Sequence, residues 1–291
     1  MNFAIVKKVA DYLSLIKFSH TVFALPFAFI GFALAILKDH YIFQPRLLLL
    51  MLLCMVFARS AAMAFNRWID RSFDALNPRT ANREIPAGII KSNNAFVFVL
   101  VSALLFIGCC YLINQLCFYL SFVALFVVLF YSYTKRFTAL CHLVLGLGLS
   151  LAPIGAYLTV TGKFDVLPIL FSCLVVTWVS GFDIIYALQD ESFDRSQQLY
   201  SIPVMLGTRG AIIVSNMLHL GSTILVLTAG IVGHFNFLYW IGATIYIAML
   251  IYQHLLVKPN DLSKVNIAFM NTNSIASICF ALFTIISLIF Q

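Results

Sequence analysis

Charged residues are scarce in this sequence: they make up 10% of its 291 residues, whereas hydrophobic residues make up 62%. Soluble domains keep about a quarter of their residues charged. With a mean hydropathy of +0.99, the composition excludes a soluble or disordered chain and indicates a multi-pass membrane protein. Because no Pro/Gly/Ser-rich linker or low-complexity tract divides the chain, we expect one integral-membrane domain over residues 1–291.

Other features are missing as well. The seven cysteines show no CxxC spacing, so neither a disulfide framework nor a zinc site is supported. The amino-terminal segment lacks a small-residue cleavage site, so we expect no cleavable signal peptide. Basic residues outnumber acidic ones and give a formal charge of +7. Membrane topology and contact with anionic groups such as lipid phosphates account for this charge, so no nucleic-acid partner is expected.

Long apolar runs are abundant. A hydrocarbon core of about 30 Å requires roughly 20 apolar residues for each helix that crosses it. The sequence therefore predicts an all-α membrane protein with about nine transmembrane helices in one bundle, and two long loops, 67–93 and 188–211, that form a cytoplasmic cap. The predicted spans are 14–37, 46–66, 94–113, 116–133, 139–161, 165–187, 212–232, 235–257 and 267–290.

The basic residues predict the orientation. If the amino terminus is cytoplasmic, thirteen of the eighteen Lys and Arg residues fall on the cytoplasmic side of the predicted spans. This bias follows the positive-inside rule. We therefore expect a bacterial-type inner (plasma) membrane protein whose two long loops, and any site they form, face the cytoplasm.

Seven of the eleven carboxylates lie in or just beyond two short segments. Acidic residues at the ends of membrane helices are costly and by default mark a functional site. Four-residue spacing places Asn66, Asp70 and Asp74 on one helical face. In the second segment, one face carries Asp183, Tyr186, Asp190 and Asp194. If the two oxygen-rich faces converge, they would bind hard divalent cations such as Mg²⁺.

The two segments together resemble the paired signature of the UbiA family of intramembrane aromatic prenyltransferases. The resemblance rests on Asn66-x-x-x-Asp70-x-x-x-Asp74, then Arg79-Thr80-x-x-Arg83, then Asp183-x-x-Tyr186-Ala-x-x-Asp190-x-x-x-Asp194. Two motifs in order are far more specific than a single DxxxD. The chain departs from the common family pattern after Arg83, where Glu84-Ile85-Pro86 replaces Pro-Leu.

The resemblance implies a Mg²⁺-dependent enzyme with a central cavity that transfers a polyprenyl group from polyprenyl diphosphate to an aromatic acid, forming a C–C bond and releasing diphosphate. Membrane lipid surrounds such an enzyme. The implied Mg²⁺ ligands are Asn66, Asp70, Asp74, Asp190 and Asp194. The residues expected to contact phosphate or the cavity are Arg59, Arg71, Arg79 and Lys135. Arg136 is expected to grip phosphate or the acceptor carboxylate, Asp183 to orient or deprotonate the acceptor, and Tyr186 to line the path of the allylic cation.

The acceptor that the resemblance favours is 4-hydroxybenzoate, as in ubiquinone-type quinone biosynthesis, and 1,4-dihydroxy-6-naphthoate in futalosine-type menaquinone biosynthesis is the alternative. Two other function classes stay open at this point. A cation-coupled transporter would place its acidic residues near the bilayer midplane, whereas here they concentrate at one edge. A CDP-alcohol phosphotransferase would carry an Asp-Gly pair in its acidic motif, and neither segment contains one.

Overall fold

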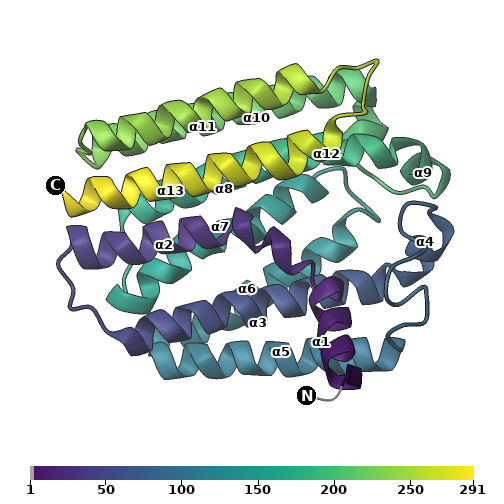
Figure 1. Cartoon of the computed structure of the whole chain (residues 1–291), viewed down its shortest axis with the longest axis horizontal. Helices are drawn as coiled ribbons and strands as arrows, with labels where there is room; N and C mark the ends of the chain where they lie inside the picture. Colours follow the sequence, from purple (N-terminus) through teal and green to yellow (C-terminus); the bar gives the residue numbers. More distant parts are fainter. Residues whose placement is uncertain (1–2) are drawn as a thin grey trace. The chain divides into compact units, whose positions relative to one another are not determined.

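The computed structural model describes residues 3–291 and is built from helices, with no β-strand in that range. The chain separates into two compact units. The first unit comprises the described residues up to Thr21 together with Leu49–Tyr133, and the second comprises Val22–Leu48 and Thr134–Gln291. Figure 1 shows the helices of both units. Each unit is described by itself, so the prediction that residues 1–291 form a single domain stays a prediction.

The first unit contains helices from the amino-terminal half of the chain. Leu15, Ala64 and Val99 form its apolar core together with Ile85 and Ile90 from the connection after α4. Since this connection contributes core side chains, part of the predicted loop 67–93 is packed against the helices. The helices are α1 (Phe3–Leu15), α3 (Pro45–Ile69, which begins in the second unit), α4 (Arg71–Leu76), α5 (Ser92–Ile113) and α6 (Gln115–Thr134).

The second unit contains a larger helical bundle. Helix α8 packs against α7 and α10, α2 packs against α7 and α13, and α13 packs against α11 (Figure 1). At its centre Trp178 is fully buried, and its indole N–H donates to Asn273 Oδ1 at 3.0 Å. Its elements are η1 (Phe18–Phe23, which begins in the first unit), α2 (Leu25–Ala33), η2 (Leu34–Lys38), α7 (Cys141–Thr161), α8 (Val166–Ala187), η3 (Leu188–Asp190), α9 (Glu191–Ser196), α10 (Ile202–Val232), α11 (Phe237–Leu256), α12 (Val265–Ile267), η4 (Ala268–Thr272) and α13 (Asn273–Ile289).

The described residues include eight helices that are long and apolar enough to cross a membrane, and they match eight of the nine predicted spans. The prediction of one continuous helix over 14–37 is wrong. Lys17 has φ 46°, a 3₁₀ turn follows, and the apolar helix over Leu25–Lys38 is short. Pro26 lies in the first turn of α2, where its missing N–H is tolerated but would interrupt a longer helix.

The predicted loop 188–211 is also corrected. Residues 188–196 form η3 and α9, and α10 begins at Ile202 rather than at 212. Ser201 caps α10 by accepting a hydrogen bond from the Val204 N–H at 3.3 Å, which explains the early start. Gly207 interrupts α10 with φ 68° and ψ 173°, a backbone conformation that is open almost only to glycine.

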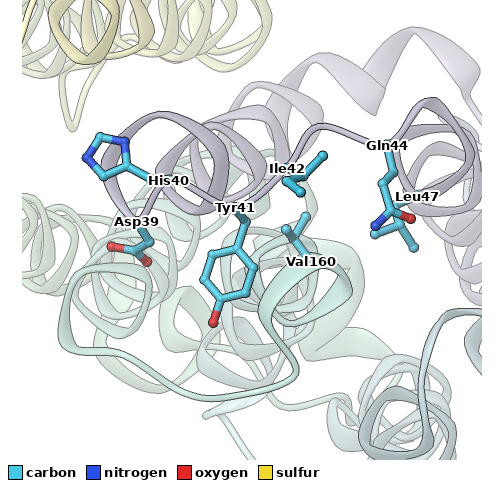
Figure 2. Close-up of a pocket in the computed structure, with 7 residues that line it drawn as sticks. All are labelled: Asp39, His40, Tyr41, Ile42, Gln44, Leu47 and Val160. Atoms are coloured by element: carbon cyan, nitrogen blue, oxygen red, sulfur yellow. The ribbon is translucent and has the colours of Figure 1, made fainter.

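A pocket of about 380 Å³ lies in the second unit at the end of α7 that carries Val160. His142 lies at the other end of this helix, and at 1.5 Å per residue the two positions are about 27 Å apart. The pocket is therefore distant from the start of α7. Figure 2 shows its lining residues, which are Asp39, His40, Tyr41, Ile42, Gln44, Leu47 and Val160.

Candidate functional site

The first acidic segment keeps its helical spacing across a break in the backbone. Helix α3 ends at Ile69 and α4 begins at Arg71, with Asp70 at the junction. The Asp70 N–H still donates to Asn66 O at 3.0 Å, and the Asp74 N–H donates to Asp70 O at 2.8 Å. The Asn66 amide also donates to Asp70 Oδ2 at 3.2 Å. The three oxygen-bearing side chains are thus stacked at successive turns.

The carboxylate of Asp74 is buried between two arginines. Arg83 Nη1 donates to Asp74 Oδ1 at 2.7 Å, and Arg67 Nη1 lies 3.9 Å from Asp74 Oδ2. The hydroxyl of Thr80 donates to the Asp74 carbonyl at 3.0 Å and holds the connection in place. Among the residues that the structure describes, Asp74 Oδ2 has no hydrogen-bond partner. One oxygen of a buried carboxylate therefore retains its capacity to accept a hydrogen bond or bind a cation.

Basic side chains line the same part of the first unit. Arg59 Nη2 donates to Lys17 O at 3.1 Å. Within the described part of the chain, Arg59 Nε and Arg67 Nε and Nη1 are buried without a hydrogen-bond partner. The buried guanidinium groups of Arg59 and Arg67 give this region a positive potential. This positive potential favours an anion. The sequence analysis selected Arg59 but missed Arg67, because burial of a side chain at a helix end has no local sequence signal.

The other two predicted phosphate contacts in this unit lie at the surface. Arg71 is exposed, its Nη1 donates to Trp68 O at 2.7 Å, and its guanidinium carbon lies 5.0 Å from the centre of the Trp68 ring. Arg79 is also exposed, and its backbone N–H donates to Asn77 Oδ1 at 3.0 Å. The guanidinium of Arg71 is therefore held against Trp68 by stacking and by one hydrogen bond.

The second acidic segment follows a similar path at the end of α8. Asp183 and Tyr186 lie on α8, Asp190 lies at the junction of η3 and α9, and Asp194 lies on α9. A 3₁₀ helix turns about 120° per residue rather than about 100°, so the three residues of η3 rotate α9 by about 60° relative to a continuous helix. The single face predicted for 183–194 is therefore twisted. The ring of Tyr186 packs on Phe269, with centroids 4.2 Å apart.

Two hydrogen bonds connect Tyr200, between α9 and α10, to the start of α7 and to the basic turn after α6, which contains Lys135 and Arg136. The Tyr200 N–H donates to Lys135 O at 2.7 Å, and the Cys141 thiol donates to Tyr200 O at 3.6 Å. The side chains of Lys135 and Arg136 are half-buried on this turn. The turn that carries these two residues thus lies beside the connection between α9 and α10, and both residues belong to the second unit.

Asp183 has a partner that the sequence analysis missed. His142 Nδ1 lies 2.7 Å from Asp183 Oδ2, and the imidazole is buried whereas the side chain of Asp183 keeps 22% exposure. The two residues are 41 positions apart, so no local pattern joins them. The available signal was the place of His142, directly after the basic turn and near the predicted cytoplasmic end of its span.

The oxygen donors of the first acidic segment are of the kind that a hard divalent cation binds. In the described residues, no three His, Cys, Asp or Glu side chains are grouped closely enough to hold a metal ion. Mg²⁺ binds in proteins through one or two carboxylates and completes its octahedral shell with waters and substrate phosphates. The stacked side chains of Asn66 and Asp70 and the unpartnered oxygen of Asp74 match that need.

Comparison with known proteins gives one consistent result. The sequence pattern of the UbiA prenyltransferase family matches residues 24–275. The chain is 30% identical over 223 residues to 4-hydroxybenzoate octaprenyltransferase from Tolumonas auensis, an alignment that covers 77% of this chain and 78% of the relative.

Solved structures agree on the fold. A UbiA homologue from Aeropyrum pernix in its apo form has a TM-score of 0.83 at 30% identity, covering 92% of this chain and 97% of the homologue. A UbiA homologue from Archaeoglobus fulgidus, solved with GPP and Mg²⁺ bound, has a TM-score of 0.75 at 20% identity, covering 97% and 100%. With a family match over residues 24–275, the two acidic segments and eight apolar helices, this chain belongs to the UbiA prenyltransferase family of integral membrane enzymes.

Proposed function

We propose that this prenyltransferase moves a polyprenyl group from polyprenyl diphosphate to the ring of an aromatic acid, with 4-hydroxybenzoate as the acceptor. The observation that carries the proposal is the stack of Asn66, Asp70 and Asp74, with one carboxylate oxygen of Asp74 unpartnered among the described residues. The name of the Tolumonas relative supports the choice of acceptor. The site faces the cytoplasm of a bacterial-type inner membrane.

The acidic side chains hold the metal in this proposal. Asn66, Asp70 and Asp74 bind Mg²⁺ directly or through water, and so do Asp190 and Asp194. When bound, Mg²⁺ neutralises the negative charge that grows on the leaving diphosphate as the allylic C–O bond breaks. Since Arg83 Nη1 already holds one oxygen of Asp74, this carboxylate offers mainly its other oxygen to the metal.

The basic side chains bind the diphosphate. Arg59 and Arg67 present buried guanidinium nitrogens that have no hydrogen-bond partner among the described residues. Arginine suits phosphate because its planar fork donates two parallel hydrogen bonds. Arg71, Arg79 and Lys135 add cations nearer the surface, and Arg136 binds phosphate or the carboxylate of the acceptor.

The chemical step is an electrophilic substitution on the aromatic ring. The allylic C–O bond breaks and its electron pair leaves with the diphosphate. A ring carbon of the acceptor donates an electron pair to the allylic carbon, the new C–C bond forms, and the ring loses a proton to regain aromaticity. Asp183 orients the acceptor hydroxyl or takes up a proton, and the ring of Tyr186 lines the path of the allylic cation.

The test is a transfer assay with the purified full-length protein in detergent. Radiolabelled polyprenyl diphosphate and Mg²⁺ are offered in parallel to 4-hydroxybenzoate and to 1,4-dihydroxy-6-naphthoate. We expect labelled 4-hydroxybenzoate, loss of product with EDTA, and at least a hundredfold lower turnover in Asp70→Ala and Asp190→Ala, in line with the loss of an electrostatic contact to the leaving group.

The matched control is Asp261→Asn, which removes an exposed carboxylate from the connection between α11 and α12 and should leave turnover unchanged. Transfer only to the naphthoate would keep the enzyme class and replace the acceptor. Absence of transfer to both acceptors, or equal activity of Asp70→Ala and wild type, would overturn the proposal.

A further inference from the structure

A buried histidine connects three helices of the second unit. His142 lies in the first turn of α7, and its Nδ1 is 2.7 Å from Asp183 Oδ2 on α8. On the other side of the ring, the Ile202 N–H at the start of α10 points to His142 Nε2 at 3.4 Å. The Ser180 hydroxyl donates to the carbonyl of His142 at 3.1 Å. Both ring nitrogens and the carbonyl of this residue therefore have partners.

These contacts assign the tautomer of the imidazole. A backbone N–H can only donate, so Nε2 accepts from Ile202 and the proton of a neutral ring lies on Nδ1. The Nδ1–H then donates to Asp183 Oδ2. A carboxylate that accepts such a hydrogen bond is fixed in its rotation about the Cβ–Cγ bond, and its other oxygen has a defined direction.

The two side chains of the pair differ in their exposure to solvent. The side chain of His142 is 4% exposed, whereas that of Asp183 is 22% exposed. The histidine is therefore closed off within α7, α8 and α10, and the carboxylate is the member of the pair that a small molecule can reach. Tyr200, two residues before Ile202, forms the hydrogen bonds to Lys135 and Cys141. The connection between α9 and α10 therefore contacts both the basic turn and His142.

We propose that His142 is a positioning residue that donates from Nδ1 to Asp183 Oδ2 and so aims the other carboxylate oxygen at the aromatic acceptor. This inference rests on the proposed function, because it assigns the acceptor to Asp183. His142 itself touches no reacting atom. Its removal should raise the KM for the acceptor and lower kcat while binding of the prenyl diphosphate is unchanged.

The activity test compares two substitutions at one position. Asn keeps an N–H donor at the position of Nδ1, whereas Leu has a similar shape without a donor. We expect His142→Leu to lower kcat/KM for the acceptor about tenfold or more, the size of a lost hydrogen bond to a charged group. His142→Asn should keep most of the wild-type value. In the Asp183→Asn background, His142→Leu should have little further effect, because the carboxylate on which it acts is gone.

A second readout does not depend on turnover. In protein labelled with ¹⁵N-histidine, the signal lost in His142→Asn should show a protonated Nδ1 and an unprotonated Nε2, and Asp183→Asn should shift it. A signal with the proton on Nε2 would overturn the pair even if the enzyme is active.

Equal losses in His142→Leu and His142→Asn, or a parallel loss of prenyl diphosphate binding, would show a merely structural role and overturn the proposal. If the wild-type protein transferred to no aromatic acid, the proposed function would fail and the acceptor role of Asp183 with it. The ¹⁵N signature would still decide whether the hydrogen bond exists, so the two failures are distinguishable.

Discussion

At the scale of single residues, the carboxylate of Asp74 pairs with two arginines and is also a proposed metal ligand, and these two roles compete. Arg83 holds one of its oxygens at 2.7 Å, and the guanidinium of Arg67 lies 3.9 Å from the other. The side chain of Arg67 is 5% exposed, so its charge depends on a nearby anion for compensation. Asp74 is thus a structural counter-ion as well as the proposed metal ligand.

Asp74→Asn should therefore destabilise the protein as well as inactivate it. Removing one partner from a buried ion pair typically costs about 3–5 kcal/mol, so we expect a clearly lower melting temperature in detergent without substrate. Arg83→Gln should cost only about 1 kcal/mol, because Arg83 is 24% exposed and Asp74 keeps Arg67. Equal melting temperatures for wild type and Asp74→Asn would contradict this account of the buried cluster.

At the scale of helices, a glycine on α7 allows this helix to pack closely against α8 in the second unit. A Cβ on Gly146 of α7 would lie 2.4 Å from Ser180 Oγ and 2.6 Å from the Val176 carbonyl oxygen of α8. The Val176 carbonyl belongs to the backbone of α8 and cannot move aside as a side chain can. The two helices therefore approach this closely only because residue 146 has no side chain. The same contact brings α7 near enough to α8 for His142 to reach Asp183.

Gly146→Ala and Gly155→Ala form a matched pair on α7. Gly146→Ala should destabilise the protein by about 1–3 kcal/mol through overpacking. Gly155→Ala should be neutral or stabilising by up to about 1 kcal/mol, because no atom lies within 4 Å of its added Cβ and alanine favours the helix. Thermal unfolding of the two variants in the same detergent checks this difference, and a greater loss at Gly155 would refute it.

At the scale of the whole molecule, the distribution of Lys and Arg predicts which loops share a side of the membrane. The connection after α11, which contains Lys258 and Lys264, is expected in the cytoplasm, as is the second acidic segment. The short connection between α10 and α11, which contains His234, is expected on the opposite side. One membrane crossing by α11 separates the two connections.

This orientation can be measured with single introduced cysteines. In intact cells, a membrane-impermeant maleimide should label His234→Cys and should label Ser263→Cys only after the membrane is permeabilised. Each variant is compared with the unmodified chain, whose own cysteines set the background. The reverse pattern would place the second acidic segment outside the cytoplasm and remove the proposed location of the site.

Local patterns determined much of this protein. Length and continuity of apolar runs predicted eight of the helices that the structure contains, because each run must span the hydrocarbon by itself. Four-residue spacing predicted the stack of Asn66, Asp70 and Asp74, since neighbours on a helical face are set by the helix alone. The same spacing was less reliable at Asp190, where a 3₁₀ turn changes the rotation.

Only the tertiary structure decided which side chains meet. The hydrogen bond of His142 to Asp183, the burial of Arg67 beside Asp74 and the close approach at Gly146 each join parts of the chain whose contact depends on packing. Sequence periodicity tells which face of a helix a residue occupies, but not which other helix covers that face, because packing selects partners by shape across the whole bundle. The acidic segments and Arg83 therefore could be recognised from the chain alone, whereas the contacts of Arg67 and His142 with the acidic side chains could not.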